Sequence, residues 1–226
     1  MTVRSRTKKK SPLSPPRQPA QERGRQSIRD ILDAAHRVLR REGPARITTP
    51  AIAAEAGLSI GALYHYFPNK ESVILALYET KLADIGAIVE EPIPAVGGDW
   101  RTGVRGWIHR IKAHEAALDY DIAMNEAMDH FPSLREVSRR HLSRQAVTIA
   151  GQLKRLGSRW PDEALFDLAL YAVFLNSSLW LYWAYADTPL PQGVDRLADT
   201  LVALFSPALE GAAAPGEPLA KPLPQA

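Results

Sequence analysis

The chain has 226 residues and no cysteine, and its composition is 46% hydrophobic and 23% charged. This length suits one medium domain or two small ones, and the composition is typical of a soluble protein that buries a core. The lack of cysteine excludes disulfides, thiolate metal sites and thiol chemistry. No apolar stretch follows the N-terminal charges, which argues against a secretory signal and predicts a cytoplasmic protein.

The formal net charge of +3 conceals an asymmetry along the chain. Residues 1–25 carry eight lysines or arginines and one acid, a net charge of +7. Residues 26–75 carry a net charge of +1, and the remaining 151 residues a net charge of −5. A basic front joined to an acidic body fits a polyanion partner at one end only. The alternative is that the Pro- and Lys-rich arm, residues 1–24, is simply solvated and disordered.

Apolar residues recur at helical spacing nearly everywhere, and no strand alternation is found, so the sequence predicts an all-α protein. Helices are expected over 28–39, 50–56, 60–67, 73–85, 104–122, 142–156, 164–186 and 194–205. Loops or breaks are expected at 91–98, where proline and glycine cluster, and at Pro132. From Pro207 the chain is rich in alanine, proline and glycine and is expected to be mobile.

The two short helices are joined through "AGLS" at 56–59, and with the longer helix before them they predict a helix-turn-helix. Small residues at 53, 56 and 57 allow the two helices to cross closely, while Leu58, Leu63 and Phe67 fill a small core. An outward face then remains that begins with small residues suited to a major groove and ends with groups that can bond phosphates. Its members are Ile60, Gly61, Ala62, Tyr64, His65 and Tyr66.

The stretch "ITTPAIAAEAGLSIGALYHYFPNKESVI" at 47–74 resembles the DNA-binding signature of the TetR family of bacterial transcriptional regulators. The resemblance extends over about residues 25–80. It implies phosphate contact at the start of the second helix, base and phosphate contacts at the start of the third, and backbone contacts beside them. The candidate DNA-binding residues are Thr48, Thr49, Ser59, Ile60, Gly61, Ala62, Tyr64, His65, Tyr66 and Lys70.

Two features limit what the third helix can read by itself. Ile60 and Ala62 offer apolar contacts, to a thymine methyl for instance, but no hydrogen bonds. Specificity would then depend on DNA shape, on residues outside this helix or on the basic arm. Taken singly, Tyr64 and Tyr66 are equally compatible with partly buried cover for the small core.

Members of this family join a short DNA-binding unit to a larger helical domain that dimerises and holds a small effector. The resemblance therefore implies a DNA-binding domain at 25–72 and an effector-binding and dimerisation domain at 73–210, and composition predicts a basic arm at 1–24 and a mobile tail at 211–226. The stretch 164–186 independently supports a buried helix, because Asp167 is its only charge. We expect one of its faces to pack on its own domain and another on a twin subunit, through 161–186 and 190–206.

Two other interpretations of 164–186 remain open, a membrane span and the central core helix of a monomer.

For the effector, a pocket needs polar groups on otherwise apolar faces. The candidate effector-binding residues are Trp107, His114, Asn125, Glu126, Asn176 and Trp180. A core role is the alternative for His114 and Asn176, and Glu126 would suit a cationic or hydrogen-bond-donating effector.

No enzyme, cofactor or metal is predicted. The six histidines are scattered, and His109 and His114 lie five residues apart, about 140° around a helix, which is poor for a shared metal. No glycine-rich phosphate loop or Gly-x-Ser-x-Gly motif occurs. The predicted function is a homodimeric repressor that binds a palindromic operator, with a small-molecule effector acting through the helix at 69–90 to release it. The alternative is a helical scaffold whose basic arm associates with nucleic acid or membranes without sequence preference.

Overall fold

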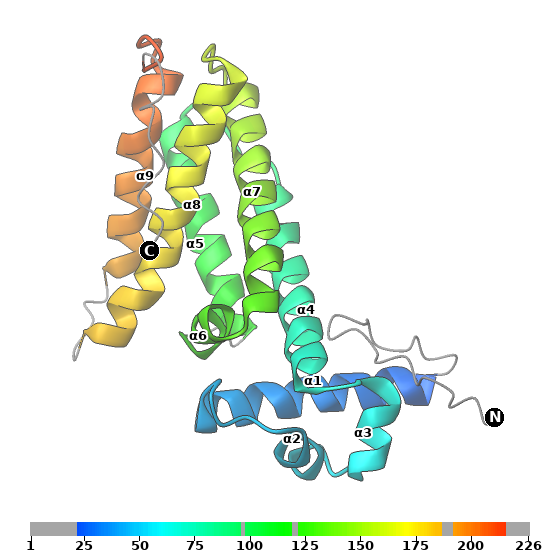
Figure 1. Ribbon diagram of the computed structural model, residues 1–226. Helices are drawn as coiled ribbons and strands as arrows, with labels where there is room; N and C mark the ends of the chain where they lie inside the picture. The colour runs from blue at the N-terminus through cyan, green and yellow to red at the C-terminus, as the bar shows by residue number, and fades with distance from the viewer. Residues whose placement is uncertain (1–21, 96–97, 119–121, 187–191, 216–226) are drawn as a thin grey trace, which may run out of the picture. The chain divides into compact units, whose positions relative to one another are not determined.

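The computed structural model describes residues 22–95, 98–118, 122–186 and 192–215. Within these ranges the chain is α-helical and contains no strand, as the sequence predicts. The basic arm, apart from its last residues, and the end of the tail lie outside the described residues. The helices, shown in Figure 1, are α1 (Glu22–Glu42), α2 (Thr49–Glu55), α3 (Ile60–Tyr66), α4 (Lys70–Glu90), α5 (Trp100–Ala117), α6 (Ile122–His130), α7 (Pro132–Arg155), α8 (Asp162–Tyr185) and α9 (Gly193–Leu209).

The chain divides into two compact units. The first comprises residues 1–83 and 120–139, and the second comprises residues 84–119 and 140–226. This division differs from the domain limits expected from the sequence, 25–72 and 73–210. The physical reasons are that α4 continues without a break past residue 72 and that α6 packs against α1 of the first unit.

The first unit is built around the two short helices. Thr48 Oγ1 accepts a hydrogen bond from the Ala51 amide at 3.3 Å, and Ser59 Oγ accepts one from the Ala62 amide at 3.1 Å, so each hydroxyl caps its helix. Gly57, with φ of 66°, makes the turn between them in a conformation that favours glycine. The expected small core forms, although Leu58 is only half-buried. Its completely buried members include Ile31, Val38, Ile52, Leu63 and Phe67.

An ion-pair bridge joins α1 to α2. Arg37 Nε lies 2.7 Å from Glu55 Oε1, and Arg41 Nη1 lies 2.9 Å from Glu55 Oε2. The hydrogen bond from Arg37, followed by that from Arg41, lowers the pKa of Glu55. The Glu55 carboxylate at the end of α2 thereby pairs with residues from two successive turns of α1.

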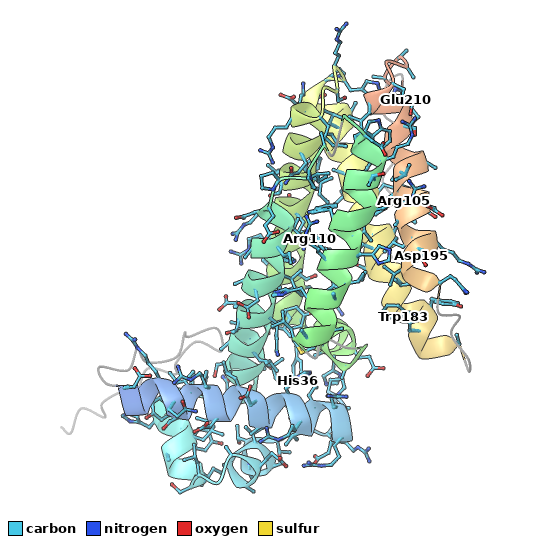
Figure 2. The ribbon with its side chains drawn as sticks, turned by 180° about the vertical axis from the view of Figure 1, so that it is seen from behind. His36, Arg105, Arg110, Trp183, Asp195 and Glu210 are labelled. Carbon is cyan, nitrogen blue, oxygen red and sulfur yellow. The ribbon has the colours of Figure 1, made fainter. Side chains whose placement is uncertain are left out.

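In the second unit α9 packs against α5 and α8. The apolar stripe of α9, including Leu197, Leu201 and Phe205, is buried inside this unit. Polar side chains also join α5 to α9. Arg105 Nη2 on α5 lies 2.8 Å from Asp199 Oδ1 on α9, and His109 Nε2 on α5 lies 2.9 Å from Asp195 Oδ1 on α9. Figure 2 labels Arg105 and Asp195.

The turn after α4 is held by a buried amide that sequence patterning did not single out. Gln152 on α7 is 1% exposed, and its Oε1 accepts a hydrogen bond from the Ile93 amide at 3.1 Å. Its Nε2 donates to the Glu91 carbonyl at 2.8 Å. Nearby, Gly103 on α5 faces the Pro94 carbonyl so closely that an added Cβ would lie 1.9 Å from the oxygen. These contacts pin residues 91–94 against α5 and α7.

Helix α8 is not covered on every side by the described residues of its own chain. Tyr171 is 58% exposed and Phe174 is 54% exposed, whereas Leu165, Ala169 and Val173 are buried. No helix among the described residues is long and apolar enough to cross a membrane.

Candidate functional site

The third helix presents the outward face that the sequence predicted. Ile60 is 44% exposed and Tyr64 49%, and Gly61 and His65 are also exposed. Ala62 and Tyr66 are half-buried. On the opposite side of this short helix Leu63 is completely buried. The local sequence thus buries one side of α3 and leaves a side with apolar, phenolic and imidazole groups in solvent.

A hydrogen bond inside the unit links two of the candidate residues. Tyr64 Oη and Thr49 Oγ1 are 3.0 Å apart, and either atom can be the donor. Thr49 is 8% exposed, so it sits beneath the surface between α2 and α3. In this conformation Thr49 orients the phenol of Tyr64 and offers little surface of its own.

The two capping residues, by contrast, are exposed. The oxygens of Thr48 and Ser59 each accept an amide hydrogen bond, but a hydroxyl also has a proton to donate. Each group can therefore cap its helix and donate to a phosphate oxygen at the same time. The phosphate contacts expected of both residues stay predictions.

Lys70, a predicted contact to the DNA backbone, also has contacts within the protein. It is half-buried at the start of α4, and its Nζ donates to the Ile47 carbonyl at 3.2 Å. The same nitrogen lies 5.5 Å from the centroid of the Phe131 ring. Part of its hydrogen-bonding capacity thus connects α4 to the residue before the α2 cap, and this structural role was not apparent from the sequence.

Part of this unit is similar to known proteins. Residues 31–77 match the family model described as "Bacterial regulatory proteins, tetR family". Residues 31–77 are therefore similar to the TetR family. The Fatty acid metabolism regulator protein of Bacillus subtilis is 35% identical over 63 residues, which are 28% of this chain and 32% of that protein. The HTH-type transcriptional regulator BetI of Brucella anthropi is 38% identical over 58 residues, 26% of this chain and 30% of that protein.

These two matches span less than a third of each relative's length. The fold likeness extends further. A TetR-family transcriptional regulator from Streptomyces coelicolor, of known structure, aligns with 81% of this chain and 99% of its own with a TM-score of 0.57. At 24% sequence identity this likeness establishes that the chain has a TetR-like fold over both units.

The candidate effector residues do not form one cluster. Trp107 and Asn176 line a small cavity of about 20 Å³ in the second unit, among side chains from α4, α5, α7, α8 and α9. His114 is half-buried on α5 and does not line this cavity, and Glu126 is an exposed residue of the first unit. The side chains of Asn125 and Trp180 lie outside the described residues.

A buried ion pair beside this cavity was missed by the sequence analysis. Lys112 is 5% exposed and Glu115 is 3% exposed, and Lys112 Nζ lies 2.8 Å from Glu115 Oε2. Lys112 Nζ also donates to the Asn176 carbonyl at 3.3 Å. Burial lowers the pKa of Lys112, and the neighbouring Glu115 carboxylate opposes that effect. The only available signal was that Lys112 and Glu115 lie at helical spacing from the apolar Ile108 and Ile111.

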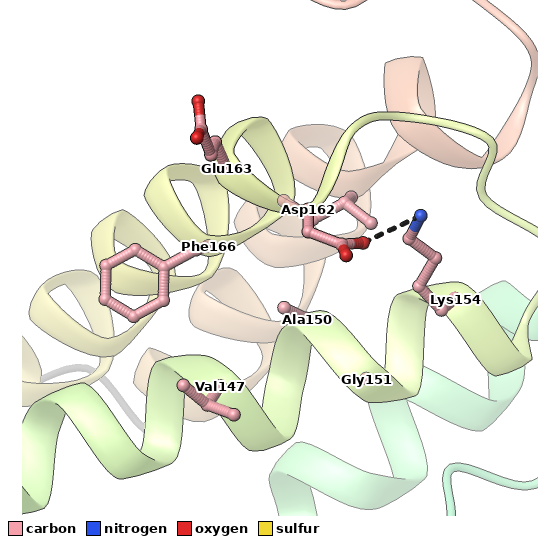
Figure 3. Close-up of a pocket in the computed structure, with 8 residues that line it drawn as sticks. Val147, Ala150, Gly151, Lys154, Asp162, Glu163 and Phe166 are labelled. Atoms are coloured by element: carbon pink, nitrogen blue, oxygen red, sulfur yellow. Dashed lines mark ion pairs between the residues drawn. The ribbon is translucent and has the colours of Figure 1, made fainter.

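A second, open cleft of about 570 Å³ lies between α7 and α8. Figure 3 shows Val147 and Ala150 on α7 facing the stretch of α8 that carries Phe166. At one end Lys154 Nζ lies 2.9 Å from Asp162 Oδ1, the ion pair drawn in the figure. Among the described residues no group of three or more histidines and carboxylates could hold a metal ion.

Proposed function

We propose that the chain is a DNA-binding transcriptional repressor that binds a palindromic operator as a homodimer and is released by a small-molecule effector. The observation that carries this proposal is the outward face of α3, mounted on a TetR-family unit. The exposed hydroxyls of Thr48 and Ser59 and the half-exposed phenol of Tyr64 supply phosphate contacts, while Ile60 and Gly61 approach the base edges.

The DNA-binding step is tested by selecting duplexes from a random pool and measuring affinity for the enriched sequence and a scrambled one. Ile60→Asp should then weaken binding about 100-fold, because a negative charge about 6 Å from a phosphate costs about 3 kcal/mol at an effective dielectric of 20. Ala87→Asp places the same charge on an exposed position of α4 in the second unit and should leave affinity unchanged. The scaffold alternative predicts that no duplex is preferred and that both variants behave alike.

The basic arm, residues 1–24, is proposed to add contacts that do not depend on sequence. Each phosphate contact contributes about 0.9 to the slope of log affinity against log salt. Deleting the arm should therefore lower affinity for enriched and scrambled duplexes alike and flatten both slopes. Unchanged slopes would leave the arm without a role in DNA binding.

For the homodimer, the burial of side chains favours α8 together with the adjoining part of α7. On α8 Tyr171 is 58% and Phe174 54% exposed, and on α7 Val147, which lines the α7–α8 cleft, is 60% exposed. The sequence also predicted that residues 190–206 contribute to the dimer interface. We propose a smaller contribution from them, because the apolar stripe of α9 is buried within its own unit. Two recognition helices related by a two-fold axis could then read half-sites at a spacing that this contact fixes.

The choice of variant matters for testing the dimer. Leu179 is 8% exposed and Leu201 is 2% exposed, so arginine at either position should unfold the second unit before it reports on assembly. Phe174→Arg instead places the charge on an exposed position and should yield helical monomers that no longer bind the enriched duplex. Lys81→Arg is a charge-neutral control. Light scattering that finds the Phe174 variant dimeric would place the interface elsewhere.

The release step would use α4, which is continuous from Lys70 to Glu90 and so contributes to both units. An effector changes DNA affinity only if it binds two conformations of the protein with different strength. The second unit offers a cavity lined by residues of α4, α5, α7, α8 and α9, and this supports placing the effector there.

A further inference from the structure

The small cavity of the second unit has a definite chemical character. Six of the residues around it are Trp107, Ile111, Glu115, Ile149, Asn176 and Leu201, from four different helices. Its volume of about 20 Å³ exceeds the roughly 10–15 Å³ that one water molecule needs. The described conformation can therefore hold one hydroxyl-sized group, and a larger ligand must push the apolar walls apart.

Among the buried polar side-chain atoms of the lining residues, two have no hydrogen-bond partner in the described part of the chain. They are Trp107 Nε1, which can only donate, and Asn176 Oδ1, which can only accept. Both atoms are buried, and Trp107 as a whole is 1% exposed. Buried polar groups in folded proteins are nearly always paired, so this donor and this acceptor indicate a missing occupant.

The occupant must match both atoms. A hydroxyl oxygen accepts a hydrogen bond from an N–H group and donates its own proton to a carbonyl oxygen. A hydroxyl group thus has both the acceptor that Trp107 Nε1 requires and the donor that Asn176 Oδ1 requires. A bare hydrocarbon satisfies neither, and a carboxylate cannot donate to Asn176.

The charges beside the cavity argue for an uncharged ligand. Lys112 and Glu115 already neutralise each other, and Lys112 also donates to the Asn176 carbonyl. An added carboxylate would face the Glu115 carboxylate, and an added ammonium would compete with Lys112 for it. A buried charge without its own partner is strongly unfavourable.

We infer that the effector is an uncharged, mainly apolar molecule whose hydroxyl group pairs with Trp107 Nε1 and Asn176 Oδ1. This inference rests on the proposed role of the second unit as an effector domain. In the effector-free protein a single water makes the same two hydrogen bonds. The effector displaces that water and reproduces its hydrogen bonds, which is the condition for displacement without loss of affinity.

Four compounds with the same ring test the ligand class: cyclohexanol, methylcyclohexane, cyclohexanecarboxylate and cyclohexylammonium. Their binding to the full chain is measured by calorimetry and by tryptophan fluorescence. Cyclohexanol should bind at least about tenfold more tightly than each of the other three, since an unsatisfied buried polar group costs about that factor or more. Equal affinities, tighter binding of a charged compound, or no binding of cyclohexanol up to its solubility limit would overturn the inference.

Variants of the two polar residues test the site. Asn176→Leu and Trp107→Phe should each abolish the preference for cyclohexanol over methylcyclohexane. Trp160→Phe is the matched control, because Trp160 is also buried but its Nε1 donates to the Ala212 carbonyl at 2.7 Å and it does not line this cavity. If Trp107→Phe fails to fold by circular dichroism, Asn176→Leu decides. A preference that survives in Asn176→Leu places the hydroxyl elsewhere and refutes the assignment.

The outcome for this site is separable from the outcome for the proposed function. A protein that binds its selected duplex but prefers charged compounds retains the proposed function and refutes the ligand class. A protein that shows the expected preference for cyclohexanol but binds no duplex retains the ligand site and refutes the repressor.

Discussion

The turn after α4 depends on the side-chain amide of Gln152 on α7. We expect the loss of this amide to destabilise the second unit. Replacing Gln152 with leucine keeps the side-chain volume but leaves the Ile93 amide without its acceptor at 3.1 Å. Ile93 is 6% exposed, so water cannot easily replace that acceptor, and an unsatisfied buried donor costs about 1–3 kcal/mol. Glu91 is exposed, and its carbonyl can turn to water instead. Gln152→Leu should therefore lower the free energy of unfolding of the second unit by about 1–3 kcal/mol.

Two measurements check this expectation. Urea denaturation reports the free energy of unfolding, and hydrogen exchange of the Ile93 amide reports the local contact, which matters because a chain of two units need not unfold in one step. Gln145→Leu is the matched control, since Gln145 lies two turns earlier on α7, is half-buried, and shows no hydrogen bond to another described residue. Unchanged exchange at Ile93, or equal destabilisation by both variants, would refute the reasoning.

Gln152→Glu provides a further test with a defined dependence on pH. The protonated carboxyl resembles the amide, having one acceptor and one donor, whereas the carboxylate would be buried against backbone carbonyls. The pKa of the introduced carboxyl should therefore be higher in the folded than in the unfolded chain. Stability is then greatest at low pH and falls as the pH rises above about 4.3, the ordinary value for a glutamate. A variant that gains stability over that range would contradict the proposed environment of residue 152.

Three other perturbations have defined outcomes. Tyr64→Phe should lower the free energy of unfolding by about 0.5–1.5 kcal/mol, because its hydrogen bond to Thr49 is lost. If the phenol also contacts a phosphate, operator affinity should fall by more than this amount. A double-mutant cycle with Thr49→Val measures the contribution of the Tyr64–Thr49 hydrogen bond to stability. Gly103→Ala should destabilise the second unit by about 1–3 kcal/mol, because its Cβ collides with the Pro94 carbonyl, and a normal melting temperature would refute that contact. Burial, followed by a neighbouring arginine, lowers the pKa of His141 from 6.5 to about 4, so the unfolded chain takes up this proton first as pH falls. Stability should therefore drop between pH 6.5 and 4 by at most about 3 kcal/mol, and His141→Leu should lack that share of the pH dependence.

Local sequence determined most of the first unit. The caps at Thr48 and Ser59 and the left-handed Gly57 depend on neighbours within one or two helical turns. Such features can be predicted without the rest of the fold, because capping and turn formation are properties of adjacent residues. The outward face of α3 followed from the same short-range pattern.

The second unit shows where the sequence alone was insufficient. Helical periodicity indicates that a face is apolar, but it does not indicate what covers that face. It could not distinguish the buried stripe of α9 from the partly exposed apolar side of α8. It also could not reveal that Gln152, far along the chain, would hydrogen-bond the turn after α4, or that Lys112 and Glu115 would be buried together. These outcomes depend on contacts between residues from separate helices, so only the tertiary structure decided them.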